Sequence, residues 1–242
     1  MTTSIPNISI VYESEDLLIV DKPPGLSVHK EPHLDATNTQ QSLPPIIDCI
    51  KLQHTHLNNI ELRLAHRLDK VTSGLLILAK HQQAARILGN LFQQRQIGKY
   101  YLALSDKKPK KKQGSVIGDM EKSRNSQWKL TQTKLNPAIT RFHSKAVNGN
   151  RLFILKLESG KTHQIRVALK SVGSPILGDK LYSGSTSDRT YLHAYSLNFN
   201  YLDQVIHICQ PPSFGEHFSC STLHTALAEY QTPSQLHWPT RK

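Results

Sequence analysis

Short apolar runs of strand length, joined by short polar connections, constrain the fold of this chain more than any other feature of its sequence. The most apolar run, 75–79, is far shorter than the ~20 residues that a membrane-spanning helix requires. Short runs bounded by turn residues are typical of strands, and short connections favour antiparallel neighbours. We interpret six segments as strands: 8–20, 75–80, 100–104, 151–157, 191–200 and 205–209. The first of these is long enough for a short hairpin or two strands.

Three other segments have the pattern of helices. Apolar residues recur at helical spacing in 84–92, which predicts an amphipathic helix with Gly98 as its C-terminal cap. A short helix is expected at 46–52, and another at 163–172 with Thr162 or its neighbour as a candidate cap. Because strands outnumber helices, we expect an α+β fold built on a mostly antiparallel mixed sheet that helices and loops flank.

The charge balance indicates a polyanionic partner. The chain has 242 residues and a formal net charge of +12, and Lys and Arg side chains bind nucleic acids by neutralising phosphates and releasing counterions. The segment 107–112, which reads KKPKKK, is expected to be a solvated turn between strands. Its residues Lys110 and Lys111 are candidate phosphate contacts, and a merely soluble loop is the alternative. A second exposed loop is expected at 30–45.

Motifs for nucleotide or metal cofactors are absent from the sequence. No GxGxxG follows a strand, and neither a Walker lysine motif nor a GxSxG elbow occurs. The close histidine pairs, His29 with His33 and His54 with His56, have no third ligand at a useful spacing. Chemistry therefore has to come from carboxylates, basic groups and phenols, and we predict neither a metal nor a cofactor.

The cysteines and the N-terminus indicate a cytoplasmic protein. Cys49, Cys209 and Cys220 are scattered and form no CxxC pair, so we expect reduced thiols. Residues 1–7 have neither a basic start nor an apolar core, so we expect no secretion signal. No helical pairing segment is evident, which favours a monomer.

Asp69 is the carboxylate whose position in the sequence best fits a reactive site. It lies between an apolar and basic lead-in, 64–67, and the segment 72–74, immediately before a predicted buried strand. Gly74 would permit close approach to the main chain at this place. Local evidence leaves open that Asp69 only caps a turn or pairs with Arg67.

Several sequence blocks resemble motifs of one enzyme family. HRLDKVTSGL, at 66–75, resembles HRLDxxTSG, the central motif of the RluA-type pseudouridine synthases in the RluA/RsuA superfamily. Other blocks that resemble the family's motifs, in the family's order, are VDKPPGLSVH (20–29), KYYLA (99–103), SGKTHQIRV (159–167), SPILGD (174–179) and LHA (192–194). Six matches in register make the resemblance specific, and they imply the pseudouridine synthase catalytic fold with an RNA cleft across the sheet.

The resemblance also implies a reaction and three catalytic residues. Uridine in RNA would be isomerised to pseudouridine without a cofactor: the N1–C1′ bond breaks, the base turns and C5 joins C1′. The family's catalytic aspartate corresponds to Asp69, its tyrosine to Tyr101 rather than Tyr100, and its basic partner for the aspartate to Arg166. Related enzymes modify ribosomal or transfer RNA, and we favour ribosomal RNA.

Candidate RNA contacts follow from the same motifs and from the charge pattern. Arg67, two residues before Asp69, is expected to enter the space that a flipped uridine leaves. The other predicted substrate-binding residues are Lys22, Lys161, Lys110 and Lys111.

The chain departs from the family pattern at three positions. Lys161 replaces an arginine, Ala168 stands where many members have histidine, and Asp21 replaces a common asparagine. We expect residues 1–242 to form a single catalytic domain, with the motifs in about 10–212 and no separate N-terminal RNA-binding domain.

Two alternatives to a synthase stay open at this point. One is an RNA-binding module that has kept the fold and lost catalysis. The other is a glycosidic hydrolase, which would need a second acid beside Asp69, such as Glu61 or Glu158.

Overall fold

The computed structural model describes residues 5–29 and 43–240, so most of the predicted loop 30–45, and His33 with it, lies outside the described residues. The strands are β1 (Ser9–Glu13), β2 (Leu17–Lys22), β3 (Arg63–Leu64), β4 (Ser73–Ala79), β5 (Gly98–Ser105), β6 (Gln113–Gly118), β7 (Met120–Lys122), β8 (Trp128–Leu130), β9 (Ala138–Val147), β10 (Asn150–Leu157), β11 (Leu192–Tyr201) and β12 (Gln204–Cys209). The α-helices are α1 (Ile46–Gln53), α2 (Gln82–Gln93), α3 (Gln164–Ser171) and α4 (Ser221–Leu227).

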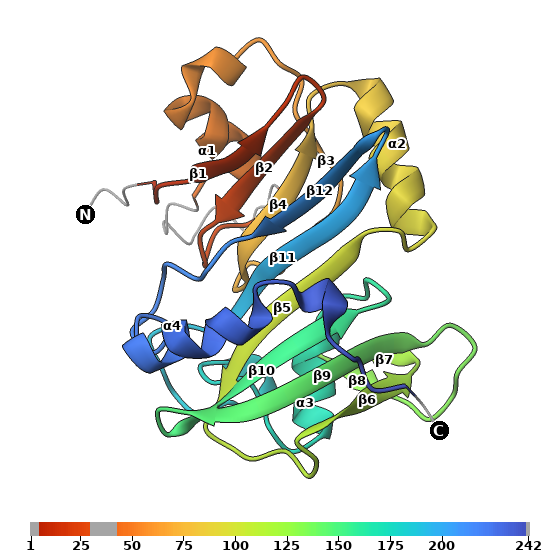
Figure 1. Ribbon diagram of the computed structural model, residues 1–242, viewed down its shortest axis with the longest axis vertical. Coiled ribbons are helices and arrows are strands. Elements are labelled where there is room, and N and C mark those ends of the chain that lie inside the picture. Colours follow the sequence, from red (N-terminus) through yellow and green to blue (C-terminus); the bar gives the residue numbers. More distant parts are fainter. Residues whose placement is uncertain (1–4, 30–42, 241–242) are drawn as a thin grey trace.

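One sheet runs through the molecule in the order β1-β2-β4-β11-β5-β10-β9-β6 (Figure 1). Neighbouring strands along this path are antiparallel except β4 and β11, which are parallel. β3 also pairs with β4, β12 pairs with β11, and β7 and β8 form a separate ribbon. The prediction of an α+β fold on a mostly antiparallel mixed sheet is confirmed.

Helices cover both faces of this sheet. In Figure 1, α4 lies in front of the strands and α3 lies behind them. Side chains alternate along the strands, so Leu75 and Ile77 of β4 pack in one core cluster with Ala84 and Leu88 of α2. Leu76, between them in sequence, belongs to the larger cluster. Among the described residues, no helix is long and apolar enough to cross a bilayer.

β4 and β11 meet over a short stretch, and the contact requires a glycine. The only paired residues there are Ser73 with His193 and Gly74 with Ala194. Gly74 has φ +107°, and a Cβ on it would lie 2.3 Å from the carbonyl oxygen of Ala194. The group that closely approaches the Gly74 main chain is therefore the neighbouring strand β11. We had expected a substrate to make this approach.

One predicted helix end is wrong. α2 ends at Gln93, the chain reverses through Arg95 in the left-handed region (φ 58°), and Gly98 begins β5 where a C-terminal cap was expected. At α3 the N-cap is His163, the neighbour of Thr162 and also left-handed (φ 58°), and no side chain makes a capping hydrogen bond.

Candidate active site

A cavity of about 420 Å³ opens beside the loop between β3 and β4. This volume lies in the range of small-molecule sites. The three predicted catalytic residues, Asp69, Tyr101 and Arg166, all line it, and so do Arg67 and Lys161. These residues come from distant parts of the sequence, and the fold brings them to one place.

Hydrogen bonds join the loop that carries Asp69 to the end of β2 and the segment that follows it. The Lys22 ammonium donates to the carbonyl oxygens of Pro23 (2.8 Å), Leu26 (2.8 Å) and Lys70 (3.3 Å). The Gly25 amide donates to the same Lys70 carbonyl at 2.8 Å. These bonds tie the residue next to Asp69 to the turn that follows β2.

Lys22 does not lie where we expected it. The side chain has no exposed surface, and burial, with the nearby Arg189 cation, lowers the pKa of its ammonium to about 7. A lysine enclosed in this way holds main chain together and offers no surface to RNA, so the prediction of a direct contact is wrong.

The Asp69 side chain stands between two hollows. It lines the cavity of about 420 Å³ and a second one of about 270 Å³, as do Arg67, His163 and Arg166. The side chain keeps 18% of its surface exposed, and one oxygen lies 3.5 Å from Nη1 of Arg166. A carboxylate in this position is accessible to a substrate and close to a cation.

Arg166 is bound more closely to another carboxylate than to Asp69. Its Nε and Nη2 donate to the two oxygens of Asp179 at 2.7 Å and 2.8 Å, and both side chains are buried. The guanidinium also lies over the Tyr182 ring, 4.9 Å from its centroid. Bidentate pairs fix a guanidinium in direction, so Asp179 orients Arg166, and the remaining Nη1 faces Asp69. The Arg166–Asp69 contact that the motif implied is present at 3.5 Å, and the structure adds Asp179 as the closer partner of Arg166.

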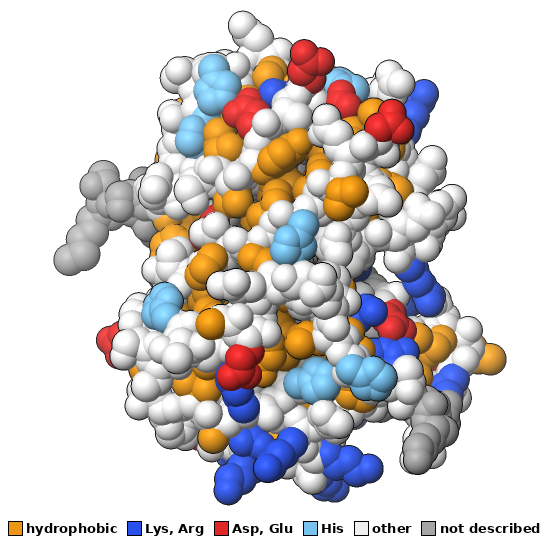
Figure 2. Space-filling view, viewed as in Figure 1, with side chains coloured by type: hydrophobic (Ala, Val, Ile, Leu, Met, Phe, Trp, Pro, Cys, Tyr) orange, Lys and Arg blue, Asp and Glu red, His pale blue; other side chains and the backbone are white. Residues whose placement is uncertain are grey.

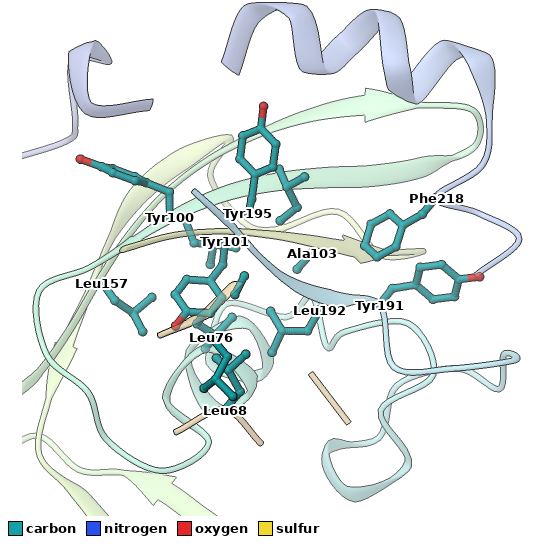
Figure 3. Packing of buried hydrophobic residues seen from close by; sticks show 14 of the residues in the cluster. Leu68, Leu76, Tyr100, Tyr101, Ala103, Leu157, Tyr191, Leu192, Tyr195 and Phe218 are labelled. Carbon is teal, nitrogen blue, oxygen red and sulfur yellow. The ribbon is translucent and has the colours of Figure 1, made fainter. Parts of the chain in front are cut away.

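Tyr101 points into the cavity from β5. Figure 3 shows its ring on the side of the sheet where Leu68, Leu157 and Leu192 lie, whereas the ring of the adjacent Tyr100 points to the other side. Tyr100 instead stacks on Trp238, with 5.8 Å between ring centroids. The alternation of a strand therefore selects Tyr101 of the two for the cavity.

The phenol of Tyr101 is held in its protonated form. Burial raises its pKa well above the ordinary value, and the neighbouring Asp69 charge adds to the effect. At neutral pH the hydroxyl is thus available as a hydrogen-bond donor, while the ring offers a flat apolar face.

The turn before α3 is built around a buried glutamine. Gln164 Oε1 accepts from the hydroxyl of Ser159 (2.9 Å) and from the amide of Lys161 (3.0 Å), and its Nε2 donates to Thr140 of β9 (2.9 Å). This network holds the chain that leads into His163, whose left-handed backbone is unusual for a residue other than glycine. Strained backbone that the surrounding structure holds in place is frequent at functional sites.

The basic loop between β5 and β6 lies apart from the cavity. Neither Lys110 nor Lys111 lines it, both are exposed, and the Lys110 amide bonds to Val172 beyond the C-terminal end of α3 at 3.4 Å. Figure 2 shows Lys and Arg side chains gathered at the end of the molecule where Figure 1 places this loop. These lysines can contact RNA only at a distance from Asp69.

The structure weakens the alternatives that the sequence left open for Asp69. Glu61 is paired with Arg63 at 2.5 Å, and Glu158 with Arg141 at 2.6 Å. Neither glutamate lines the cavity of about 420 Å³. Within residues 5–29 and 43–240, no hydrogen bond or ion pair joins Asp69 to Arg67. No three potential ligand side chains gather into a metal site in that part of the chain.

Several residues at the site carried no role in the sequence reading. Asp179, His163 and Lys99 each lie within one of the sequence blocks that resemble the family's motifs, and these blocks were the signal that could have found them. A block alone does not say what each side chain contacts. Phe92 of α2 also lines the cavity, and its helical pattern predicted only a core position.

Comparison with known proteins gives consistent matches. Residues 16–171 match the family model described as RNA pseudouridylate synthase. An uncharacterized RNA pseudouridine synthase of Haemophilus influenzae is 49% identical over 228 residues, which cover 93% of this chain and 96% of that protein. The ribosomal large subunit pseudouridine synthase C of Rickettsia bellii is 32% identical over 78% of this chain, which spans 62% of that protein.

The fold has solved counterparts. Human RNA Pseudouridylate Synthase Domain Containing 1 matches with a TM-score of 0.72 and 22% identity, over 99% of this chain and 100% of that one. Human RNA Pseudouridylate Synthase Domain Containing 4 matches with a TM-score of 0.66 and 23% identity, over 96% and 94%. At this identity the matches concern the fold.

Proposed function

The chain belongs to the family of RNA pseudouridine synthases, and from that premise we propose that it isomerises particular uridines of structured RNA with Asp69 as its catalytic carboxylate. The observation that carries this proposal is the cavity of about 420 Å³, in which Asp69 is the one carboxylate among the described residues. Tyr101 and Arg166 line the same space.

The reaction can be divided among these residues. Asp69 either attacks C1′ or removes a proton from the sugar, and the N1–C1′ bond breaks in both cases. The uracil then turns in the cavity and C5 bonds to C1′. In the first case this breaks the bond between Asp69 and C1′, and in the second case the sugar takes its proton back from Asp69. C5 finally loses its proton and N1 gains one. Overall, atoms balance without an oxidant, a reductant or water.

Tyr101 and Arg166 have separable parts in this scheme. The Tyr101 ring stacks on the turning uracil and its protonated hydroxyl donates a hydrogen bond to it. Arg166, held by Asp179, presents Nη1 to Asp69 and keeps that carboxylate in place. Loss of Arg166 therefore affects the geometry of the site and the packing beneath it.

Arg67 is suited to replace the uridine in its stack. The side chain is exposed and lines both cavities beside Asp69. Extrusion of a base costs a few kcal/mol, and a guanidinium can stack in the space that the base leaves.

We favour large-subunit ribosomal RNA as the substrate, with transfer RNA as the alternative. The support is the relative named ribosomal large subunit pseudouridine synthase C. The net charge of +12 suits a polyanion of this kind, and Lys161, Lys110 and Lys111 are proposed to contact its phosphates. We further propose that a monomer acts in the cytoplasm, consistent with three free cysteines.

Conversion of uridine provides the test. Purified protein is incubated with transcribed ribosomal and transfer RNA, and pseudouridine and free uracil are quantified by mass spectrometry. The wild type should form pseudouridine, and Asp69→Asn should form none while it still binds RNA. Binding without any product would favour a catalytically silent module, and free uracil would favour a hydrolase. Mapping pseudouridine in a strain that lacks the protein then identifies the target.

A further inference from the structure

Lys99, the second residue of β5, has an ammonium group without an anionic partner. Within residues 5–29 and 43–240 it makes no hydrogen bond or ion pair. It makes a cation–π contact with the Phe92 ring, 5.6 Å from Nζ to the centroid. The side chain is half-buried, and burial together with the Arg95 cation lowers its pKa. Unpaired ammonium groups are costly to enclose, so this arrangement favours an anion from outside.

Lys99 lines two adjacent hollows. One is the cavity of about 420 Å³ that contains Asp69, and the other is a smaller one of about 180 Å³. The two hollows also share the lining residues Phe92, Gln93, Leu157, Gly160 and Lys161. The smaller hollow is therefore placed to receive a group attached to a ligand in the larger one.

The charges around the smaller hollow are mostly positive. Arg95 and Lys161 line it together with Lys99. The one carboxylate there, Glu158, is already bound by Arg141 at 2.6 Å and 3.3 Å.

The His66 ring near Lys99 adds no charge. Its Nε2 accepts a hydrogen bond from the Ile77 amide at 3.0 Å, and burial lowers its pKa to about 3. The two carboxylates that line these hollows, Asp69 and Glu158, lie beside Arg166 and Arg141.

Gly160 leaves the ammonium open to this space. A Cβ at Gly160 would lie 3.5 Å from Nζ of Lys99, which is ordinary contact. A larger side chain at this position would cover the ammonium.

We propose that Lys99, with Arg95 and Lys161, binds an RNA phosphodiester next to the target uridine, in the smaller hollow adjacent to the Asp69 cavity. This inference rests on the proposed function, because the uridine has to occupy the larger cavity. The ligand class follows from chemistry: each nucleotide in RNA is flanked by phosphates, and a cluster of cations suits such a group. Lys99 would thus set the position of the backbone while Asp69 acts on the sugar.

The first test is the salt dependence of RNA binding. Affinity of a ten-nucleotide oligouridylate for wild type, Lys99→Met, Lys99→Arg and the control Lys129→Met is measured by fluorescence anisotropy at several salt concentrations. Lys129 is exposed and pairs only with Glu121, at 3.5 Å. Lys99→Met should bind roughly tenfold more weakly, with the slope of log affinity against log salt smaller by about 0.7. Lys99→Arg should retain most of the affinity, and the control should match the wild type.

The second test removes the charge from the RNA. In a synthetic RNA with a single uridine among cytidines, methylphosphonate replaces one phosphate at a time. One neutral linkage next to the uridine should weaken binding by wild type about tenfold and should not weaken Lys99→Met further. An unchanged salt slope, or additive effects of the two changes, would overturn the proposal. The scan with wild-type protein tests the proposal even if Lys99→Met fails to fold. If no neutral linkage next to the uridine weakens binding by the wild type, the proposal is wrong.

Failure of the proposed function gives a different result. Wild type that binds these RNAs with the predicted linkage preference but forms no pseudouridine in any RNA refutes the function and leaves the phosphate subsite standing. Wild type that forms pseudouridine without any role of Lys99 in affinity refutes the subsite alone.

Discussion

Two aspartates contact Arg166, and we expect their removal to affect stability very differently. Asp179 is 1% exposed and accepts two hydrogen bonds from Arg166, at 2.7 Å and 2.8 Å. Breaking a buried ion pair by removing one partner costs about 3–5 kcal/mol, because the remaining charge is uncompensated. Asp179→Asn keeps one acceptor, so we expect a loss of about 3 kcal/mol. Asp69 is 18% exposed and 3.5 Å from Arg166, so Asp69→Asn should cost less than about 1 kcal/mol.

Urea denaturation followed by tryptophan fluorescence measures both free energies of unfolding. Trp128 and Trp238 are the reporters, and the denaturant slope should stay the same in all variants. Glu158→Gln is the matched control, since its pair with Arg141 is closer to solvent, and should cost under about 1 kcal/mol. Equal losses for Asp69→Asn and Asp179→Asn, or a loss under about 1 kcal/mol for Asp179→Asn, would refute the view that Asp179 is the main partner of Arg166.

Four further expectations concern catalysis and stability. Asp69→Asn should abolish pseudouridine formation in a mass-spectrometric assay while RNA affinity stays within about threefold, since a carboxylate contributes little to the binding of a polyanion. Arg67→Ala should slow modification of structured RNA more than of flexible single strands, and equal slowing would contradict its part in base extrusion. Gly74→Ala should cost more than about 4 kcal/mol in urea denaturation because its Cβ would overlap the neighbouring strand, whereas Gly89→Ala, a helical position with open space, should gain up to about 1 kcal/mol. The pKa of Lys22 is about 7 in the folded protein, below the ordinary 10.5. Between these pH values the unfolded state binds more protons than the folded state, so the free energy of unfolding should rise with pH. Lys22→Met should flatten that rise in urea denaturation.

The parts of the fold that the sequence predicts are those with a strong apolar pattern. β4 and β10 consist of nearly continuous apolar runs, and buried strands of this kind are recognisable locally. β9 was not anticipated, because Arg141, His143 and Lys145 alternate with its buried residues and reduce the apolar signal. Its place in the sheet depends on pairing with β10, a tertiary interaction that the local sequence does not reveal.

For the site, the motif blocks predicted which residues converge but not how they bind one another. Asp69, Tyr101 and Arg166 do line one cavity. The enclosure of Lys22 and the bidentate pair of Arg166 with Asp179 depend on which segments pack over them. A lysine in a loop motif has the same local signature whether RNA or main-chain carbonyls surround its ammonium, so only the folded arrangement separates the two.

The position of β11 between β4 and β5 has a consequence for synthesis on the ribosome. Strands on either side of a third lie about 10 Å apart, so the loop of Asp69 and the strand of Tyr101 cannot reach their final separation until 192–201 has emerged and entered the sheet. A nascent chain that already contains both residues still lacks the strand between them, and Leu192 of that strand lines the cavity. A chain that ends before residue 192 therefore lacks part of the lining of this cavity.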